Sequence, residues 1–203
     1  MIDWSRILRG LKRRLAWLMS GCPKTPLLLE MIWPESLLTS PPEVSVCDGY
    51  TLRQYHEADK NAYFKLLASA GMDPCSFNYW DKHILPDGFY LIECDQTREI
   101  VAACFASHHP VERHERAGNF GWLAASPQHS GKGLGGAVSS AVTSRLIRAG
   151  YQHIYLETHD FRLPAIKIYL SMGWAPSLYC DEMHDRWKSI CDELEWPFTP
   201  EQW

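Results

Sequence analysis

No stretch of the 203-residue sequence approaches the roughly 20 consecutive apolar residues that a membrane-spanning helix requires. The sequence also lacks a C-x-x-C pair, because its seven cysteines are dispersed along the chain. An odd, scattered set of cysteines indicates free thiols in a reducing compartment. The uncharged stretch before Cys22 has only five apolar residues, fewer than the roughly 7–15 in the core of an export signal. We therefore expect a cytoplasmic protein.

Positive charge is scarce outside the N-terminal part of the chain. Residues 1–29 carry six basic side chains and one acidic one, so a net charge of −4 for the whole chain leaves −9 on the remainder. An acidic body is a poor nucleic-acid-binding surface, and it suits cationic, amine-bearing substrates. We expect no nucleic-acid partner.

The N-terminal region is predicted to be an extension of residues 1–45, followed by a domain of residues 46–203. Apolar side chains at three- and four-residue steps predict a helix with one apolar stripe, formed by Trp4, Ile7, Leu8, Leu11, Leu15 and Leu18. Basic residues surround the stripe, so the helix could lie on an anionic membrane or contact a partner. We favour packing against its own domain. Consecutive prolines in Thr39–Glu43 predict a linker.

From residue 50 onward, patterns typical of strands and helices alternate, which predicts an α/β or α+β fold with a mixed sheet. The predicted strands cover residues 50–55, 88–94, 99–107, 119–126 and 153–158. The predicted helices cover residues 57–71, 77–85, 163–172 and 185–194, together with one that ends at Gly150.

A cluster of glycines precedes the helix that ends at Gly150. Gly131, Gly133 and Gly136 satisfy the dinucleotide-binding pattern G-x-G-x-x-G, and Glu157 lies where a ribose-binding acid belongs. In that fold, however, the strand runs directly into the first glycine, whereas here residues 126–130 intervene. Only 46 residues follow Glu157, too few for the second half of such a sheet. A phosphate loop is also disfavoured, because Gly133 rather than a hydroxyl residue follows Lys132.

A third interpretation fits the segment from Gln128 to Gly133. It matches Q/R-x-x-G-x-G/A and resembles the motif of the GCN5-related N-acetyltransferase (GNAT) family. Successive backbone N–H groups of a glycine-rich turn and the following helix N-terminus can converge on one anion. The resemblance covers residues 119–174, and it ends in A-I-x-x-Y-x-x-x-G-F/W, formed here by Ala165, Ile166, Tyr169, Gly173 and Trp174.

The resemblance implies a mixed, mostly antiparallel sheet with splayed central strands flanked by helices, with acetyl-CoA as co-substrate and no metal. The residues implied to hold coenzyme A are strand residues, glycine-turn residues and one arginine, namely Leu123, Ala124, Ala125, Gln128, His129, Ser130, Gly131, Lys132, Gly133, Leu134, Gly135, Gly136 and Arg162. The chain departs from the family at two of these positions. Arg162 stands where asparagine is frequent, and Ser130 where a basic residue is frequent.

The resemblance also implies that Tyr169 is the acid that protonates the departing thiolate. For the base that takes a proton from the amine we select Glu157, with His159, His108, His109 and Glu93 as alternatives. The aromatic residues of "FNYW" (77–80) either line an acceptor pocket or belong to the core.

The resemblance implies an acetyl-CoA-dependent N-acetyltransferase that transfers acetyl to a primary amine, of a small molecule or a protein, by direct attack in a ternary complex. The alternative is a non-catalytic coenzyme A-binding or protein- or membrane-interaction module that uses the basic N-terminal helix. Nine tryptophans offer material for a homodimer interface.

Overall fold

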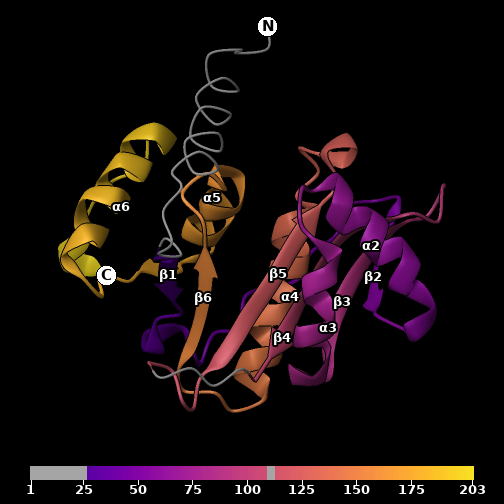
Figure 1. Ribbon diagram of the computed structural model, residues 1–203, viewed down its shortest axis with the longest axis horizontal. Coiled ribbons are helices and arrows are strands. Elements are labelled where there is room, and N and C mark those ends of the chain that lie inside the picture. The colour runs from indigo at the N-terminus through magenta and orange to yellow at the C-terminus, as the bar shows by residue number, and fades with distance from the viewer. Residues whose placement is uncertain (1–26, 109–112) are drawn as a thin grey trace, which may run out of the picture.

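The computed structural model describes residues 27–108 and 113–203, so the predicted helix near the N-terminus lies outside the described residues. Seven strands form one sheet in the order β2-β3-β4-β5-β6-β1-β7 (Figure 1). Neighbouring strands are antiparallel except for β5 and β6, which are parallel. The predicted mixed, mostly antiparallel sheet flanked by helices is therefore confirmed.

The strands are β1 (Leu29–Ile32), β2 (Tyr50–Gln54), β3 (Ile84–Cys94), β4 (Ile100–Ser107), β5 (Gly118–Ala125), β6 (Ile154–Thr158) and β7 (Ala175–Pro176). The α-helices are α2 (Lys60–Ser69), α3 (Phe77–Trp80), α4 (Leu134–Arg148), α5 (Leu163–Met172) and α6 (Asp181–Leu194). Short 3-10 helices occupy Glu35–Leu37, Glu57–Asp59, Pro74–Ser76, Asp81–His83, Pro127–His129 and Pro200–Gln202.

Glycine and proline set the ends of the two helices that follow β5 and β6. Gly133, with φ 72°, precedes α4, and Gly150, with φ 87°, follows it. In α5, Pro164 lies in the first turn, where a missing N–H costs little, and Gly173 ends the helix with φ 98°. Left-handed backbone at these positions favours glycine, and the predicted end of α4 and both predicted ends of α5 are confirmed.

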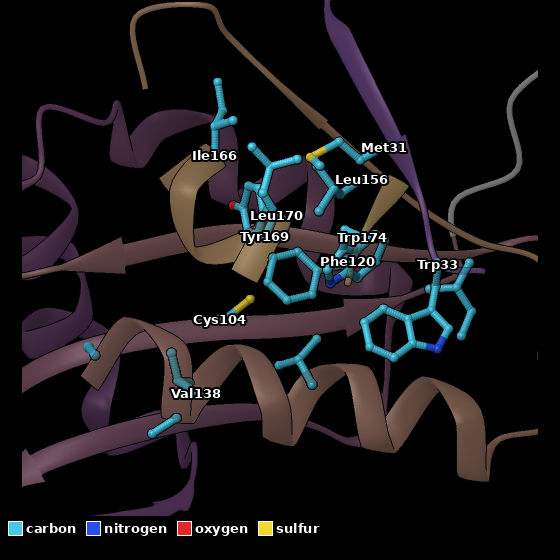
Figure 2. Close-up of a cluster of buried hydrophobic side chains, with 14 of the residues drawn as sticks. Met31, Trp33, Cys104, Phe120, Val138, Leu156, Ile166, Tyr169, Leu170 and Trp174 are labelled. Atoms are coloured by element: carbon cyan, nitrogen blue, oxygen red, sulfur yellow. The ribbon is translucent and has the colours of Figure 1, made fainter. Parts of the chain in front are cut away.

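Strand β4 separates two hydrophobic clusters, one on each face of the sheet. Cys104 and Ala106 face a large cluster that includes α4, α5 and β1, whereas Ala103 and Phe105 face a smaller one that includes α2 and α3. Alternation of side chains along a strand produces this division. Figure 2 shows Cys104 and Val138 in the larger cluster, together with Met31 and Trp33 from the N-terminal part of the chain.

The predicted helix over residues 77–85 is wrong in its C-terminal part. Helix α3 ends at Trp80, and Ile84 already pairs with Ser107 as the first residue of β3. Pro86 lies inside β3, where the register with β4 is interrupted between Ile84 and Phe89. A proline is tolerated at such an interruption because no ladder hydrogen bond is lost.

Strand β1 was not predicted, although it lies inside the sheet between β6 and β7. Leu29 and Met31 are fully buried, and the backbone N–H of Trp33 donates to the Ile154 carbonyl at 2.9 Å. The strand is only four residues long, and its partner Thr158 is distant in the sequence. The described residues contain no helix with the length and apolar character needed to span a bilayer.

Candidate active site

The site lies where β5 and β6 separate. The two strands pair only from Gly118 to Phe120 on β5 and from Ile154 to Leu156 on β6. Beyond these residues they diverge toward their C-terminal ends (Figure 1). The later half of β5 therefore presents backbone groups on this side that β6 does not use, as the predicted splay requires.

A β-bulge accompanies the separation. Ala103 pairs with Ala124 and Phe105 pairs with Gly121, so β5 has one more residue than β4 over this interval. Trp122, inside the bulge, has φ 61°, a left-handed conformation that is rare for a bulky residue. Its ring stacks on Phe105 at 6.3 Å between centroids. The sequence analysis missed this bulge, although Gly121 inside an apolar strand pattern is a signal for one.

A cavity of about 630 Å³ opens at this point. Its walls come from β5, from the end of β6, from α5, and from the segment between α2 and α3. Polar and aromatic side chains in the lining include those of Asp73, Trp80, Trp122, Glu157, His159 and Tyr169. Convergence of a few polar groups in a largely apolar hollow is typical of small-molecule sites.

Tyr169 reaches the cavity from α5. The side chain is 5% exposed and packs edge-on against Phe120, with 5.4 Å between ring centroids (Figure 2). Burial raises the pKa of its phenol far above the ordinary value, the Cys104 thiol raises it further, and Arg162 lowers it. Tyr169 is therefore protonated at neutral pH, and a protonated phenol can act as a hydrogen-bond donor or an acid.

Glu157 reaches the same cavity from β6, with a side chain that is 30% exposed. Burial raises the pKa of its carboxyl above the ordinary value and the charge of Glu30 adds to this, whereas Arg113 and His114 oppose it. A carboxylate with raised proton affinity is a better general base at neutral pH.

The alternative bases lie in different places. His159 lines the cavity and stacks on Phe161 at 5.0 Å, and burial lowers its pKa. His108 stacks on Tyr151 and is not among the lining residues, and His109 lies outside the described residues. Glu93 is bound by Arg53 at 2.9 Å and by Arg98 at 2.7 Å and does not line the cavity. The structure therefore brings Glu157, His159 and Tyr169 together.

The glycine turn lies beyond the end of β5 and leads into α4. Gly131 and Gly133 have φ 79° and 72°, and a Cβ added at either would meet no atom within 4 Å. The first N–H groups of α4 have no partner within the helix, so the turn and the helix N-terminus together offer several donors to an anion. Gln128, Ser130 and Lys132 are exposed around this turn.

Tyr50 of β2 packs beside the turn. Its hydroxyl is 2.9 Å from Nδ1 of His129, and the Lys132 ammonium lies 5.5 Å from the centre of its ring. Tyr50 therefore contacts two side chains next to the glycines. The sequence does not reveal these contacts, because Tyr50 and His129 are 79 residues apart.

The other glycines of the cluster differ in their surroundings. A Cβ on Gly135 would lie 2.9 Å from Cδ1 of Ile168, so this glycine permits close packing of α4 on α5. Gly136 faces open space, and the Leu134 side chain is buried in the core, so only its backbone can face a ligand.

The remaining predicted residues lie in the cavity, in the core or on the surface. Leu123 and Arg162 line the cavity. Ala124 is buried against the smaller cluster, and Ala125 is exposed and pairs with Ala102. In the "FNYW" segment, Phe77 is buried in the core, Tyr79 is exposed and Trp80 lines the cavity.

Comparison with known proteins finds one matching family model and many solved structures with a similar fold. Residues 52–174 match the model of the acetyltransferase (GNAT) family. No curated protein matches the sequence.

Among solved structures, a GCN5-related N-acetyltransferase from Sphaerobacter thermophilus superposes with a TM-score of 0.60 at 18% identity, over 82% of this chain and 53% of that chain. A chain of the NatC complex bound to Gag peptide and CoA superposes with a TM-score of 0.53 at 17% identity, over 61% of this chain and 83% of that chain. The ribosomal-protein-S18-alanine N-acetyltransferase from Escherichia coli superposes with a TM-score of 0.50 at 19% identity, over 61% of this chain and 76% of that chain. The chain spans about half the length of the first of these, and the likeness concerns the fold.

Proposed function

Because the chain belongs to the acetyltransferase (GNAT) family, we propose that it transfers the acetyl group of acetyl-CoA to a primary amine. We further propose that the amine attacks directly, in a ternary complex. The observation that carries this proposal is the meeting of Glu157 and Tyr169 in one cavity where β5 and β6 separate. A candidate base and a candidate acid thus face the same space, as amine acylation requires.

The residues present fit a coenzyme A molecule. Gly131 and Gly133 leave open space where other residues would carry a side chain, and the N-terminus of α4 favours negative charge. We propose that this turn, with Gln128, Lys132 and the first backbone N–H groups of α4, binds the pyrophosphate. The unpaired edge of β5 near Leu123 would bind the pantetheine amides, and Arg162 would contact the same arm.

Acetyl-CoA supplies an activated acetyl thioester, and side chains of the cavity are proposed to accept and donate the protons. An alkylammonium ion is not nucleophilic until it loses a proton, and Glu157 is the group proposed to accept it. The raised pKa of Glu157 supports this role. Tyr169 keeps its proton at neutral pH, and it is proposed to donate to the departing sulfur.

The cavity also suggests the kind of acceptor. Trp80, Trp122 and Phe161 provide aromatic walls, and Asp73 and Glu157 provide carboxylates. Aromatic faces and carboxylates together favour a cation on an apolar body. We therefore propose a primary ammonium attached to an apolar or aromatic group.

The test is acetyl transfer by the full chain. The protein would be incubated with acetyl-CoA and three amine classes, namely an arylalkylamine, an aliphatic diamine and a peptide with a free N-terminus. Release of the coenzyme A thiol would be followed with a chromogenic disulfide. We expect release with at least one class, and a loss of about 10²-fold or more in Glu157→Gln, in the usual range for a general base. Glu93→Gln, which changes a buried glutamate outside the cavity, should retain activity.

Acetyl-CoA binding without thiol release in the presence of any amine would contradict the proposal. That result would instead support the non-catalytic coenzyme A-binding module.

A further inference from the structure

A second glutamate lies beside the proposed base. Glu30 of β1 pairs directly with Glu157 of β6 in the antiparallel register, so both side chains stand on the same face of the sheet. Glu30 is 2% exposed. Two carboxylates placed side by side repel each other when both are ionised, so this arrangement requires compensating groups.

Arg113 and His114 provide this compensation. Nη2 of Arg113 lies 3.0 Å from Oε2 of Glu30 and 3.8 Å from Oε1 of Glu157, so one guanidinium contacts both carboxylates. Nε2 of His114 lies 2.8 Å from the same Oε2 of Glu30, and its Nδ1 lies 2.9 Å from Nε2 of His153. Nε2 of His114 donates to the carboxylate, and the contact of its Nδ1 with His153 holds the ring between Glu30 and His153.

The surrounding rings hold these groups in place. The Arg113 guanidinium lies over the Tyr179 ring at 4.1 Å, and the Tyr179 hydroxyl donates to the Leu28 carbonyl at 2.6 Å. His114 stacks on Tyr155 at 4.1 Å. Arg113 therefore has a fixed position between the two carboxylates.

Glu30 remains ionised in this setting. Burial alone would raise the pKa of its carboxyl, but hydrogen bonds from His114 and Ser177 and the charge of Arg113 hold the pKa below the ordinary value. Burial and His114 lower the pKa of His153, consistent with a neutral ring. The titratable or charged groups around Glu157 come from each neighbouring element, and they are Glu30, Asp73, Arg113, His114, His153, Tyr155, His159, Arg162, Tyr169 and Tyr179.

We propose that Glu30 is a positioning residue for acetyl transfer, which retains Arg113 and sets the proton affinity of Glu157. The inference rests on the proposed function, because it assigns Glu157 as the base. Glu30 acts through charge and does not line the cavity. It also lies outside residues 52–174, so the family match does not include it.

The arrangement predicts opposite effects for two substitutions. In Glu30→Gln, the negative charge beside Glu157 is lost and Arg113 is no longer neutralised. The cation then stabilises ionised Glu157, whose pKa falls. In Arg113→Met, the cation is lost while Glu30 remains, so the pKa of Glu157 rises. If Glu30 and Arg113 had only structural roles, the two substitutions would not move the pKa of Glu157 in opposite directions.

The experiment measures kcat/KM for acetyl transfer by the full chain between pH 5 and pH 9. The acidic limb should move to lower pH by about 1 unit in Glu30→Gln, within the usual effect of a neighbouring charge. It should move to higher pH by about 0.5 unit in Arg113→Met, a smaller effect because Arg113 is 45% exposed and solvent screens its charge. Glu30→Asp, which keeps the charge, should retain most of the wild-type pH profile of kcat/KM.

Glu93→Gln is the matched control. Like Glu30, Glu93 is a buried glutamate with two basic partners, here Arg53 and Arg98, but it lies away from the cavity and does not contact Glu157. Its removal should leave the acidic limb unchanged.

Two results separate the inference from the proposed function. If Glu157→Gln keeps full activity and its acidic limb, the base assignment is wrong. If Glu157→Gln abolishes the limb but neither Glu30→Gln nor Arg113→Met moves it, the role of Glu30 alone is overturned. If Glu30→Gln fails to fold, Arg113→Met still tests the inference. Its acidic limb should move to higher pH, and an acidic limb that stays in place or moves to lower pH overturns the inference.

Discussion

The glycine turn makes a prediction in which stability and ligand binding separate. Gly131→Ala places a Cβ on a residue with φ 79° but with no atom within 4 Å, so the cost is backbone strain rather than a clash. A left-handed conformation costs an ordinary residue about 1–2 kcal/mol. For a chain of this size the melting temperature should fall by about 2–8 °C.

Gly150→Ala provides a matched control at the other end of α4. Gly150 has φ 87° and equally open surroundings, so the loss of stability should be similar. Only Gly131 lies in the proposed pyrophosphate turn. Strain there should redirect the backbone N–H groups and raise the Kd for acetyl-CoA by about tenfold, which corresponds to about 1.4 kcal/mol. In Gly150→Ala the Kd should stay within about twofold.

Thermal unfolding and calorimetric titration with acetyl-CoA measure both quantities on the same samples. If the two variants bind acetyl-CoA with equal affinity, the turn does not hold the coenzyme and the argument from its glycines is refuted.

Three further predictions concern the acid, the packing of β5 and the response to pH. Tyr169→Phe should lower kcat about 10²-fold, as expected for loss of a general acid, with the Kd for acetyl-CoA little changed; steady-state kinetics showing full activity would remove Tyr169 from the mechanism. Gly118→Ala places a Cβ 2.8 Å from Cδ2 of Leu146 and 2.9 Å from Cδ2 of Tyr151, and it should cost about 1–3 kcal/mol of unfolding free energy in urea; an unchanged urea midpoint would contradict the packing. Hydrogen bonds from Arg53 lower the pKa of Asp59, so this carboxylate stabilises the fold above its unfolded pKa, and the contribution is lost as pH falls through the folded pKa. Between pH 6 and pH 3 the wild type should lose stability more steeply than Asp59→Asn, and parallel curves would count against the ion pair.

The sequence is sufficient to predict the elements with local signals. Helix α5 has proline at its start and glycine at its end, so both of its ends were predicted correctly, and the end of α4 was predicted from Gly150. The hairpin of β3 and β4 was predicted because each strand is a continuous run of strand-forming residues joined by a short turn.

The elements that were missed depend on partners distant in the sequence. β1 is a four-residue strand whose place is determined by pairing with β6 and β7, and its buried Glu30 is compensated by residues more than 80 positions away. The bulge at Trp122 is defined by the register between β4 and β5. Sequence patterns report local periodicity, and they carry no information on which strands become neighbours.

The candidate site shows the same limit. The motif predicted Tyr169 and the glycine turn as parts of the site, and Glu157 was predicted from its position at the end of a predicted strand. The cavity that unites Tyr169 with Glu157, and the contributions of Asp73 and Trp80 to its wall, follow only from the tertiary structure.

The most direct test of the account is a calorimetric titration of the full chain with acetyl-CoA, with NAD and ATP as controls. The account predicts micromolar binding of acetyl-CoA and no binding of NAD or ATP. Binding of NAD without binding of acetyl-CoA would contradict the account, because the glycine turn would then serve a dinucleotide.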